Sequence, residues 1–164
     1  MIKLIDIANE DDAMDVWRLQ HASYRVEAAL IGFAELPPLL DTVDSLQRCG
    51  ETFFGYYEDD EPVGAVAVER EGDAAVICRM MVHPDYFRRG IAGRLIEHVE
   101  RVLSNCRKIV VSTGSANEPA LCLYKKHGFT EFASEQIAPS LWMTRLEKRN
   151  DRMRAAAKKE RDER

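Results

Sequence analysis

The run from Glu51 to Pro84 restricts the possible folds of this chain more than any other feature. It reads ETFFGYYEDDEPVGAVAVEREGDAAVICRMMVHP and is rich in residues that favour β-strands. Two turn signals interrupt it, at Asp59 to Pro62 and at Gly72-Asp73, and the second matches a two-residue hairpin loop. The run therefore predicts an antiparallel meander of three strands.

After the meander, the pattern changes to helix, strand, helix. One helical face carries the apolar residues Ile91, Leu95, Ile96, Val99 and Leu103. Lys108 to Ser112 is a short apolar strand, and Glu118 to Lys126 has the pattern of a second helix. A helix between the strand ending at Val82 and the strand at 108–112 is a crossover connection, which makes those two strands parallel neighbours.

The remaining segments complete an α+β fold. Met1 to Ile7 reads as a strand, and Asn9 caps a helix that ends near Gly32 to Pro38. A short helix is expected over 42–48, and two final strands around Glu131 and at 141–146. The sequence thus predicts a central mixed, mostly antiparallel sheet of six to seven strands, flanked by about four helices.

Charge divides the 164 residues into two parts. We expect one domain over 1–146 and a charged basic C-terminal tail over 147–164, as a frayed helix or a disordered segment. From Arg145 onward there are nine Lys/Arg and five Asp/Glu, so the net charge of −5 leaves −9 for residues 1–144. An acidic body argues against nucleic acid as a partner, because binding to phosphate backbones depends on basic surface.

The chain also lacks the signals of secretion, membrane insertion and metal binding. Residues 1–7 do not read as a secretion signal, and no run of eighteen apolar residues occurs. The four cysteines are widely separated and form no CxxC pair, so neither a disulfide nor a zinc site is expected. These features predict a cytoplasmic protein with no membrane partner.

The stretch YFRRGIAGRL, from Tyr86 to Leu95, lies where a strand ends and a helix begins. Free N–H groups and the helix dipole favour an anion there, and Gly90 and Gly93 permit close approach to the backbone. A phosphate group is the natural ligand, although a purely structural tight turn fits the same residues equally well. The dinucleotide pattern GxGxxG and the nucleotide-triphosphate pattern GxxxxGK[ST] are both absent.

Two segments resemble the motifs of the GNAT N-acetyltransferase superfamily. VHPDYFRRGIAGRLI is similar to its pyrophosphate-binding motif, with Val82, Pro84, Gly90 and Ala92 in register and Phe87 where the family usually has Arg or Gln. NEPALCLYKKHGF matches a second family segment at Asn117, Ala120, Leu123, Tyr124, Lys126, Gly128 and Phe129. Residues 20–50 also look like a group of uncharacterised bacterial acetyltransferases in that superfamily.

The resemblance implies a fold and a cofactor. The parallel strands would splay apart to form a cleft for acetyl-CoA or coenzyme A, and no metal would take part. The pantetheine arm would pair with main chain near Met80, Met81 and Val82, where a backbone N–H would polarise the thioester carbonyl. Further cofactor-binding positions would be Arg88, Arg89, Gly90, Ile91, Ala92, Gly93, Asn117, Ala120 and Tyr124.

The sequence offers a candidate for the general acid but no clear candidate for the general base. Tyr124 is either a core aromatic or, as the resemblance implies, the general acid that protonates the departing thiolate. No residue stands out as the general base, and the weak candidates are Glu69, Asp73, Glu27 and His83.

The acceptor side is represented by Tyr24, Arg25, Glu27 and Arg79. Arg79 lies inside a strand and needs a partner. It either pairs internally, with Glu27 or another acid of the first helix, or meets an acidic group on the acceptor.

Three classes of function remain open. The first is transfer of an acetyl group from acetyl-CoA to a primary amine of a small molecule or peptide, by direct attack in a ternary complex. The second is a non-catalytic acyl-CoA-binding or regulatory domain, and the third is an interaction protein that uses its basic tail. The scaffold does not identify the acceptor, and an exposed terminal strand could pair into a homodimer.

Overall fold

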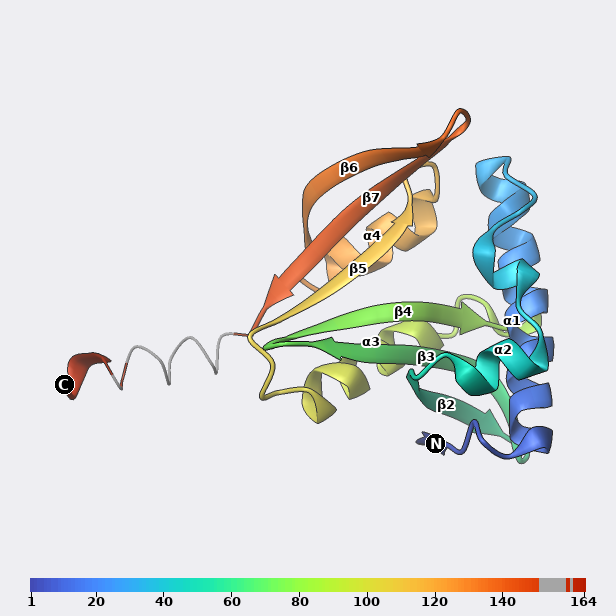
Figure 1. The fold of residues 1–164 in the computed structure, drawn as a ribbon, viewed down its shortest axis with the longest axis horizontal. Coiled ribbons are helices and arrows are strands. Elements are labelled where there is room, and N and C mark those ends of the chain that lie inside the picture. Colours follow the sequence, from blue (N-terminus) through green and yellow to red (C-terminus); the bar gives the residue numbers. More distant parts are fainter. Residues whose placement is uncertain (151–158, 160) are drawn as a thin grey trace.

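A seven-stranded mixed sheet forms the centre of the molecule, in the order β1-β2-β3-β4-β5-β7-β6 (Figure 1). The computed structural model describes residues 1–150, 159 and 161–164. The strands are β1 (Ile2–Ile5), β2 (Thr52–Glu58), β3 (Glu61–Glu71), β4 (Ala74–Val82), β5 (Lys108–Gly114), β6 (Thr130–Ala138) and β7 (Leu141–Arg149). All neighbours are antiparallel except β4 and β5. The predicted meander, crossover and fold class are confirmed.

Helices cover both faces of the sheet. They are α1 (Glu10–Ile31), α2 (Val43–Arg48), α3 (Ile91–Val102) and α4 (Glu118–Lys126), with short 3₁₀ turns at Pro37–Leu40 and Pro84–Tyr86. Residues on β2 and β3 alternate between two cores, so Phe53 belongs to the core with α1 and α2, whereas Phe54 belongs to the core with α3 and α4.

Local chemistry accounts for the helix starts. Asn9 accepts a hydrogen bond from the N–H of Asp12, Thr42 forms a capping box with Ser45, and Asn117 accepts from the N–H of Ala120. Gly32, with a φ of 70°, ends α1 in the left-handed conformation.

The parallel pair is joined only at one end. Pairing between β4 and β5 runs from Ala74 and Lys108 to Ile77 and Val111, and beyond that the strands diverge, as Figure 1 shows. The last turn of α1 reaches across the open end, because a Cβ atom on Gly114 would lie 3.2 Å from the Ile31 side chain. The expected splay is present, and α1 spans it.

The last strand is longer than the sequence suggested. β7 pairs with β5 up to Arg149, and the N–H of Asn150 donates to the carbonyl of Arg107. Residues 147–149, which charge alone assigned to the tail, therefore belong to the sheet. The rest of the predicted tail lies largely outside the described residues. Within the described part of the chain, no helix has the length and apolar character needed to cross a membrane.

Candidate functional site

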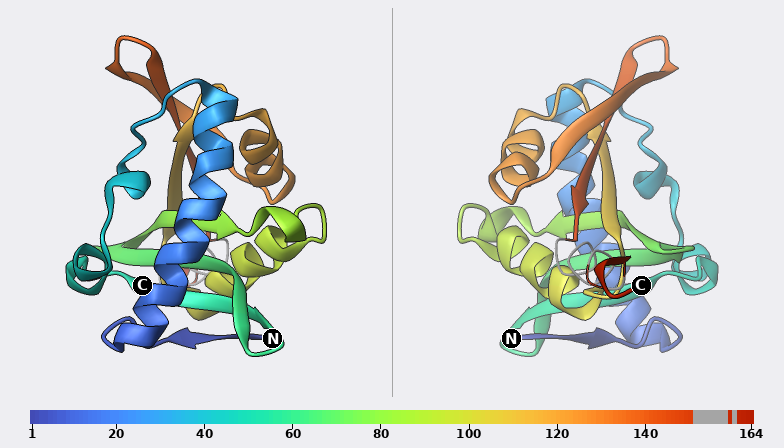
Figure 2. Two further views of the ribbon diagram at one scale, coloured as in Figure 1. Left: turned by 90° about the vertical axis from the view of Figure 1, so that its right-hand side faces the viewer. Right: turned by 90° about the vertical axis from the view of Figure 1, so that its left-hand side faces the viewer.

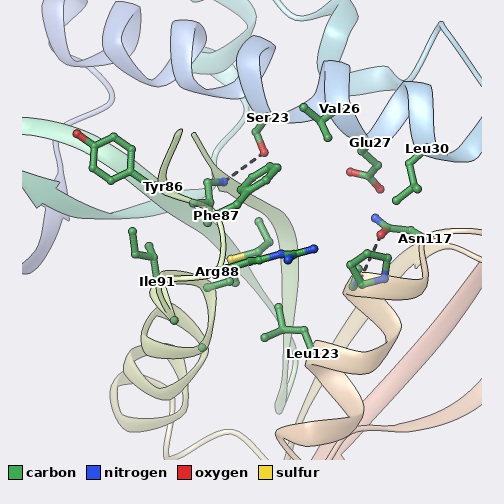
Figure 3. A pocket seen from close by; sticks show the side chains of 17 residues that line it. Ser23, Val26, Glu27, Leu30, Tyr86, Phe87, Arg88, Ile91, Asn117 and Leu123 are labelled. Carbon is green, nitrogen blue, oxygen red and sulfur yellow. Dashed lines mark hydrogen bonds between the residues drawn. The ribbon is translucent and has the colours of Figure 1, made fainter. Parts of the chain in front are cut away.

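A cavity of about 500 Å³ opens where the parallel strands separate. Its walls come from one face of α1, the end of β4, the loop before α3 and the first turns of α3 and α4 (Figure 3). Ten of the residues singled out from the sequence line it, namely Glu27, Met80, Val82, Arg88, Gly90, Ile91, Ala92, Gly93, Asn117 and Ala120. The structure therefore brings together segments that are almost a hundred residues apart.

The loop before α3 forms one wall of this cavity. Arg88 and Gly90 have φ angles of 62° and 76°, and no side chain caps the helix that follows. A Cβ atom on Gly90 would meet nothing within 4 Å, so there is open space beside the backbone. The first-turn N–H groups of α3 have no partner in the helix itself, and the first turn contains no acidic residue. This wall has the charge and the access that an anionic group requires.

Two residues near the loop have a structural contact that the sequence did not indicate. A Cβ atom on Gly93 would lie 3.0 Å from Nε2 of His127, so the absence of a side chain lets α3 approach the end of α4. The guanidinium of Arg89 lies 4.8 Å from the ring centre of Tyr86 and does not line the cavity.

The outer half of β4 presents two N–H groups to the side where β5 has diverged. The N–H of Met80 donates to the Tyr24 hydroxyl at 3.3 Å, and the N–H of Val82 donates to Oγ of Ser23 at 3.2 Å. Met81 points to the opposite face, where it is buried against α1. The main-chain groups expected to meet a pantetheine arm are thus held by two hydroxyls from α1.

Tyr124 lies in the hydrophobic core and does not line the cavity, with only 3% of its surface exposed. Its ring contacts Phe129 edge-on, at 5.5 Å between ring centres. Burial, together with the nearby Tyr24 and Glu27, raises the pKa of the Tyr124 hydroxyl, which stays protonated at neutral pH. Among the described residues this hydroxyl has no hydrogen-bond partner. Every fully enclosed side-chain nitrogen or oxygen in the described part of the chain does have such a partner. The hydroxyl oxygen therefore retains some accessible surface.

Glu27 and Asn117 face each other across the cavity, from α1 and from the start of α4 (Figure 3). Oδ1 of Asn117 accepts from the N–H of Ala120 at 3.2 Å, which leaves its amide nitrogen available toward Glu27. Burial raises the pKa of the Glu27 carboxyl, and hydrogen bonding from Asn117 opposes part of that rise. The two side chains place a partly buried carboxyl group in the cavity, and its charge contributes to the raised pKa of the Tyr124 hydroxyl.

Comparison with known proteins identifies the family. Residues 49–131, from just before β2 to the start of β6, match a family model described as an acetyltransferase (GNAT) domain. The chain belongs to the GNAT acetyltransferase family. It is also 31% identical over 144 residues to the UPF0157 protein YqkA of Bacillus subtilis, which covers 88% of this chain and 42% of that protein. The chain thus spans about two fifths of that relative's length.

Solved structures show the same fold at low sequence identity. The ribosomal-protein-S18-alanine N-acetyltransferase of Escherichia coli superposes with a TM-score of 0.73 at 15% identity, over 90% of this chain and 91% of that one. An acetyltransferase of Thermus thermophilus gives 0.72 at 24% identity, over 91% and 97%. The PaiA N-acetyltransferase of Thermoplasma acidophilum, solved with coenzyme A, gives 0.66 at 17% identity, over 91% and 99%.

Arg79 is the acceptor-side candidate whose partner was predicted wrongly. Its guanidinium pairs with Asp41 and with Glu51 at 3.0 Å, and donates to Gln20 of α1 at 3.0 Å. Internal pairing was one of the two alternatives, but both acids lie beyond the first helix, and Glu27 is not among them. Burial raises the pKa of Glu51, and the hydrogen bonds and charge of Arg79 outweigh it, so the pKa is lowered overall. The guanidinium of Arg79 is therefore paired within the protein rather than directed at the cavity.

The other acceptor-side candidates divide between core, surface and cavity. Tyr24 is buried and reaches β4, Arg25 is exposed and lies outside the cavity wall, and only Glu27 lines the cavity. Of the other weak base candidates, Glu69, Asp73 and His83 do not line it.

Sequence reasoning named Glu27 on α1 but missed its three neighbours on the same face of this GNAT cavity. Ser23, Val26 and Leu30 line it with Glu27, at the i, i+3, i+4, i+7 spacing of one helical face. Val26 and Leu30 are 41% and 50% exposed, although both are apolar. The available signal was the second stripe, Ala13, Val16, Leu19, Gln20, Tyr24 and Ala28, which supplies the buried face by itself. Four more residues line the cavity although sequence reasoning assigned them no functional role: Tyr86, Phe87, Pro119 and Leu123.

Proposed function

We propose that this protein transfers an acetyl group from acetyl-CoA to a primary amine, by direct attack in a ternary complex. One observation carries the proposal: the anion-favouring loop and the end of β4 both line the cavity between the splayed strands, and α4, which carries Tyr124, forms another of its walls. The acceptor is a small molecule or a peptide with a free amine.

The residues present fit coenzyme A. The backbone from Arg88 to Gly93 would hold the diphosphate, since Gly90 leaves space beside it and Arg88 adds positive charge. The N–H groups of Met80 and Val82 would face the pantetheine arm once the hydroxyls of Tyr24 and Ser23 release them. Acetyl-CoA supplies the activated acetyl thioester.

Phe87 is compatible with this assignment. It replaces the Arg or Gln usual in the motif, lines the cavity and is 42% exposed. A diphosphate held by main-chain N–H groups depends little on that side chain, whereas an apolar ring changes what packs beside it.

Tyr124 would act as the general acid. A free thiol has a pKa of about 8.5, which is lower than that of a tyrosine hydroxyl, so the phenol does not give up its proton unaided. It hydrogen-bonds to the departing sulfur and passes its proton on while it recovers one from the attacking nitrogen. Burial serves this role by keeping the group protonated.

Two measurements test the proposal. Calorimetry should detect coenzyme A binding to the wild-type protein, and a thiol-release assay should detect turnover with at least one amine from a set of spermidine, lysine, an aminoglycoside and an alanine-terminated peptide. Tyr124→Phe should lower kcat by about 100-fold or more, with coenzyme A affinity unchanged. Tyr57→Phe, which removes a hydroxyl on β2 away from the cavity, should leave both unchanged.

The outcomes separate the two leading classes. Binding of coenzyme A without turnover of any amine would favour a non-catalytic acyl-CoA-binding domain. Absence of coenzyme A binding by folded protein would remove both.

A further inference from the structure

The cavity contains one carboxylate that the proposed function does not yet use. Glu27 lines the wall between Val26 and Leu30 of α1 (Figure 3). No lysine, arginine or histidine among the described residues forms an ion pair with it. A carboxylate that is partly withdrawn from water and has no cationic partner in the protein is a site for an external cation.

From this geometry, and resting on the proposed function, we infer that Glu27 binds the ammonium group of the acceptor and accepts its proton before acetyl transfer. The neighbouring apolar side chains define the substrate class further. Val26 and Leu30 would contact an alkyl stem next to the charged nitrogen, so the acceptor is an alkylammonium compound or an aliphatic side chain ending in an amine.

The position of Glu27 couples it to Tyr124. The titratable groups that interact with these two residues are Tyr24 on α1 and each other, and Arg88 lines the same cavity. The Glu27 charge is one of the causes that raise the pKa of the Tyr124 hydroxyl. When Glu27 accepts a proton that charge is cancelled, and Tyr124 becomes a better proton donor at the moment it is needed.

Asn117 has a positioning role in this arrangement. Its Oδ1 is committed to the N–H of Ala120, so its amide nitrogen is oriented toward the carboxylate of Glu27. A hydrogen bond donated by that nitrogen would orient the carboxylate, as an outer partner orients a reactive group. The capping residue of α4 thereby links the helix that carries Tyr124 to the helix that carries Glu27.

The protons balance through named atoms. One N–H bond of the ammonium group breaks, its electron pair stays on nitrogen, and the proton forms an O–H bond on Glu27. The nitrogen then bonds to the acetyl carbon, the C–S bond breaks with its electron pair going to sulfur, and Tyr124 protonates that sulfur. A second proton leaves the nitrogen and restores Tyr124, and Glu27 releases its proton to solvent. The products are one amide, one thiol and one proton.

Binding of n-propylammonium to the full-length protein tests the anchoring role without any turnover. We expect Glu27→Gln to weaken binding by at least about 10-fold, because a charge-assisted contact is lost. Glu35→Gln removes an exposed carboxylate eight residues further along the chain and should leave binding unchanged. Uncharged n-propanol should bind both variants alike. Equal binding of n-propylammonium by wild type and Glu27→Gln, or no binding by wild type, overturns the inference.

A pH profile tests the proton transfer, using an amine that the wild type acetylates. Glu27→Gln should lose at least about 100-fold in kcat/KM at pH 7, and the loss should shrink as pH approaches the pKa of the amine, which then arrives neutral. A defect of constant size across pH would contradict the proton-acceptor role.

Folding and the proposed function are checked separately. Glu27→Gln should unfold at the same or a higher temperature, because a neutral side chain removes the cost of a partly buried charge. A carbon-13 NMR shift of the Glu27 carboxyl on addition of n-propylammonium provides a readout in unaltered protein. Failure of coenzyme A to bind would contradict the proposed function. The n-propylammonium binding measurements do not require coenzyme A and could still be interpreted.

Discussion

At the scale of single residues, Ser23 competes with the proposed cofactor. Its Oγ accepts from the N–H of Val82 at 3.2 Å, so a pantetheine arm must displace it. A hydrogen bond of this kind contributes about 0.5–1.5 kcal/mol, and Ser23→Ala should therefore tighten coenzyme A binding about two- to tenfold in calorimetry. Ser134→Ala, an exposed position on β6, is the matched control. Weaker binding by Ser23→Ala would mean that the hydroxyl contacts the cofactor rather than competing with it.

Gly90 is needed both for its left-handed backbone conformation and, by our proposal, for close approach of the diphosphate. Gly72 shares the conformation but lies away from the cavity, so comparing the two glycines separates these effects. Gly90 and Gly72 both have positive φ, and a Cβ atom on either would meet nothing within 4 Å. Replacement by Ala should cost each position a similar free energy of unfolding, about 1 kcal/mol, from left-handed strain. Only Gly90→Ala should also weaken coenzyme A binding, because only there does a ligand approach the backbone. If both variants bound coenzyme A with equal affinity, the diphosphate would not bind at this loop.

At the scale of elements, Arg79 ties β4 to the loops around α2. It pairs with Asp41 before α2 and Glu51 before β2, and donates to Gln20 of α1. Removing the cation leaves two partly buried carboxylates unpaired, so Arg79→Met should lower the free energy of unfolding by about 3–5 kcal/mol at pH 7. Arg70→Met, which removes an exposed arginine from β3, should cost far less.

The pH dependence of this cluster follows from the direction of its pKa shifts. In the folded protein, the pKa values of Asp41 and Glu51 lie below their ordinary values of about 3.9 and 4.3. Their contribution is therefore complete above about pH 4.5 and is lost as pH falls below it. Denaturant unfolding at several pH values should show a steeper acid-side loss for wild type than for Arg79→Met. Parallel curves would mean that the carboxylates are not paired with Arg79 in solution.

Local sequence signals were enough to predict the helices and strands, but not the tertiary contacts between them. The cap at Asn9, the apolar spacing of the later helices and the turn at Gly72-Asp73 act within a few residues and placed the helices and hairpin close to their observed bounds. The partners of Arg79 lie 28 and 38 residues away, and no periodicity encodes such a contact. The site shows the same division. Motifs around α3 and α4 indicated most of their lining residues, whereas on α1 only Glu27 was indicated, because packing against the sheet decides which side of that helix is buried.

At the scale of the whole molecule, two half-sheets meet over only four residue pairs. β4 and β5 pair from Ala74–Lys108 to Ile77–Val111 and then separate, and α1 connects the separated ends through Ile31 beside Gly114 (Figure 2). The cavity lies between these halves, with α3 on one side and α4 on the other. A ligand held there contacts both halves and supplies the contacts that the divergent strands lack.

This arrangement predicts that coenzyme A stabilises the molecule as a unit. At about 100 times its dissociation constant, it should raise the free energy of unfolding by about 2.7 kcal/mol. For a chain of this size, that corresponds to a rise of roughly 5–10 °C in melting temperature. Hydrogen exchange should slow together at the end of β4, the first turn of α3 and the first turn of α4, because one ligand bridges them. Protection limited to α3 would mean that the cofactor touches one half only, and the splayed strands would then need another role.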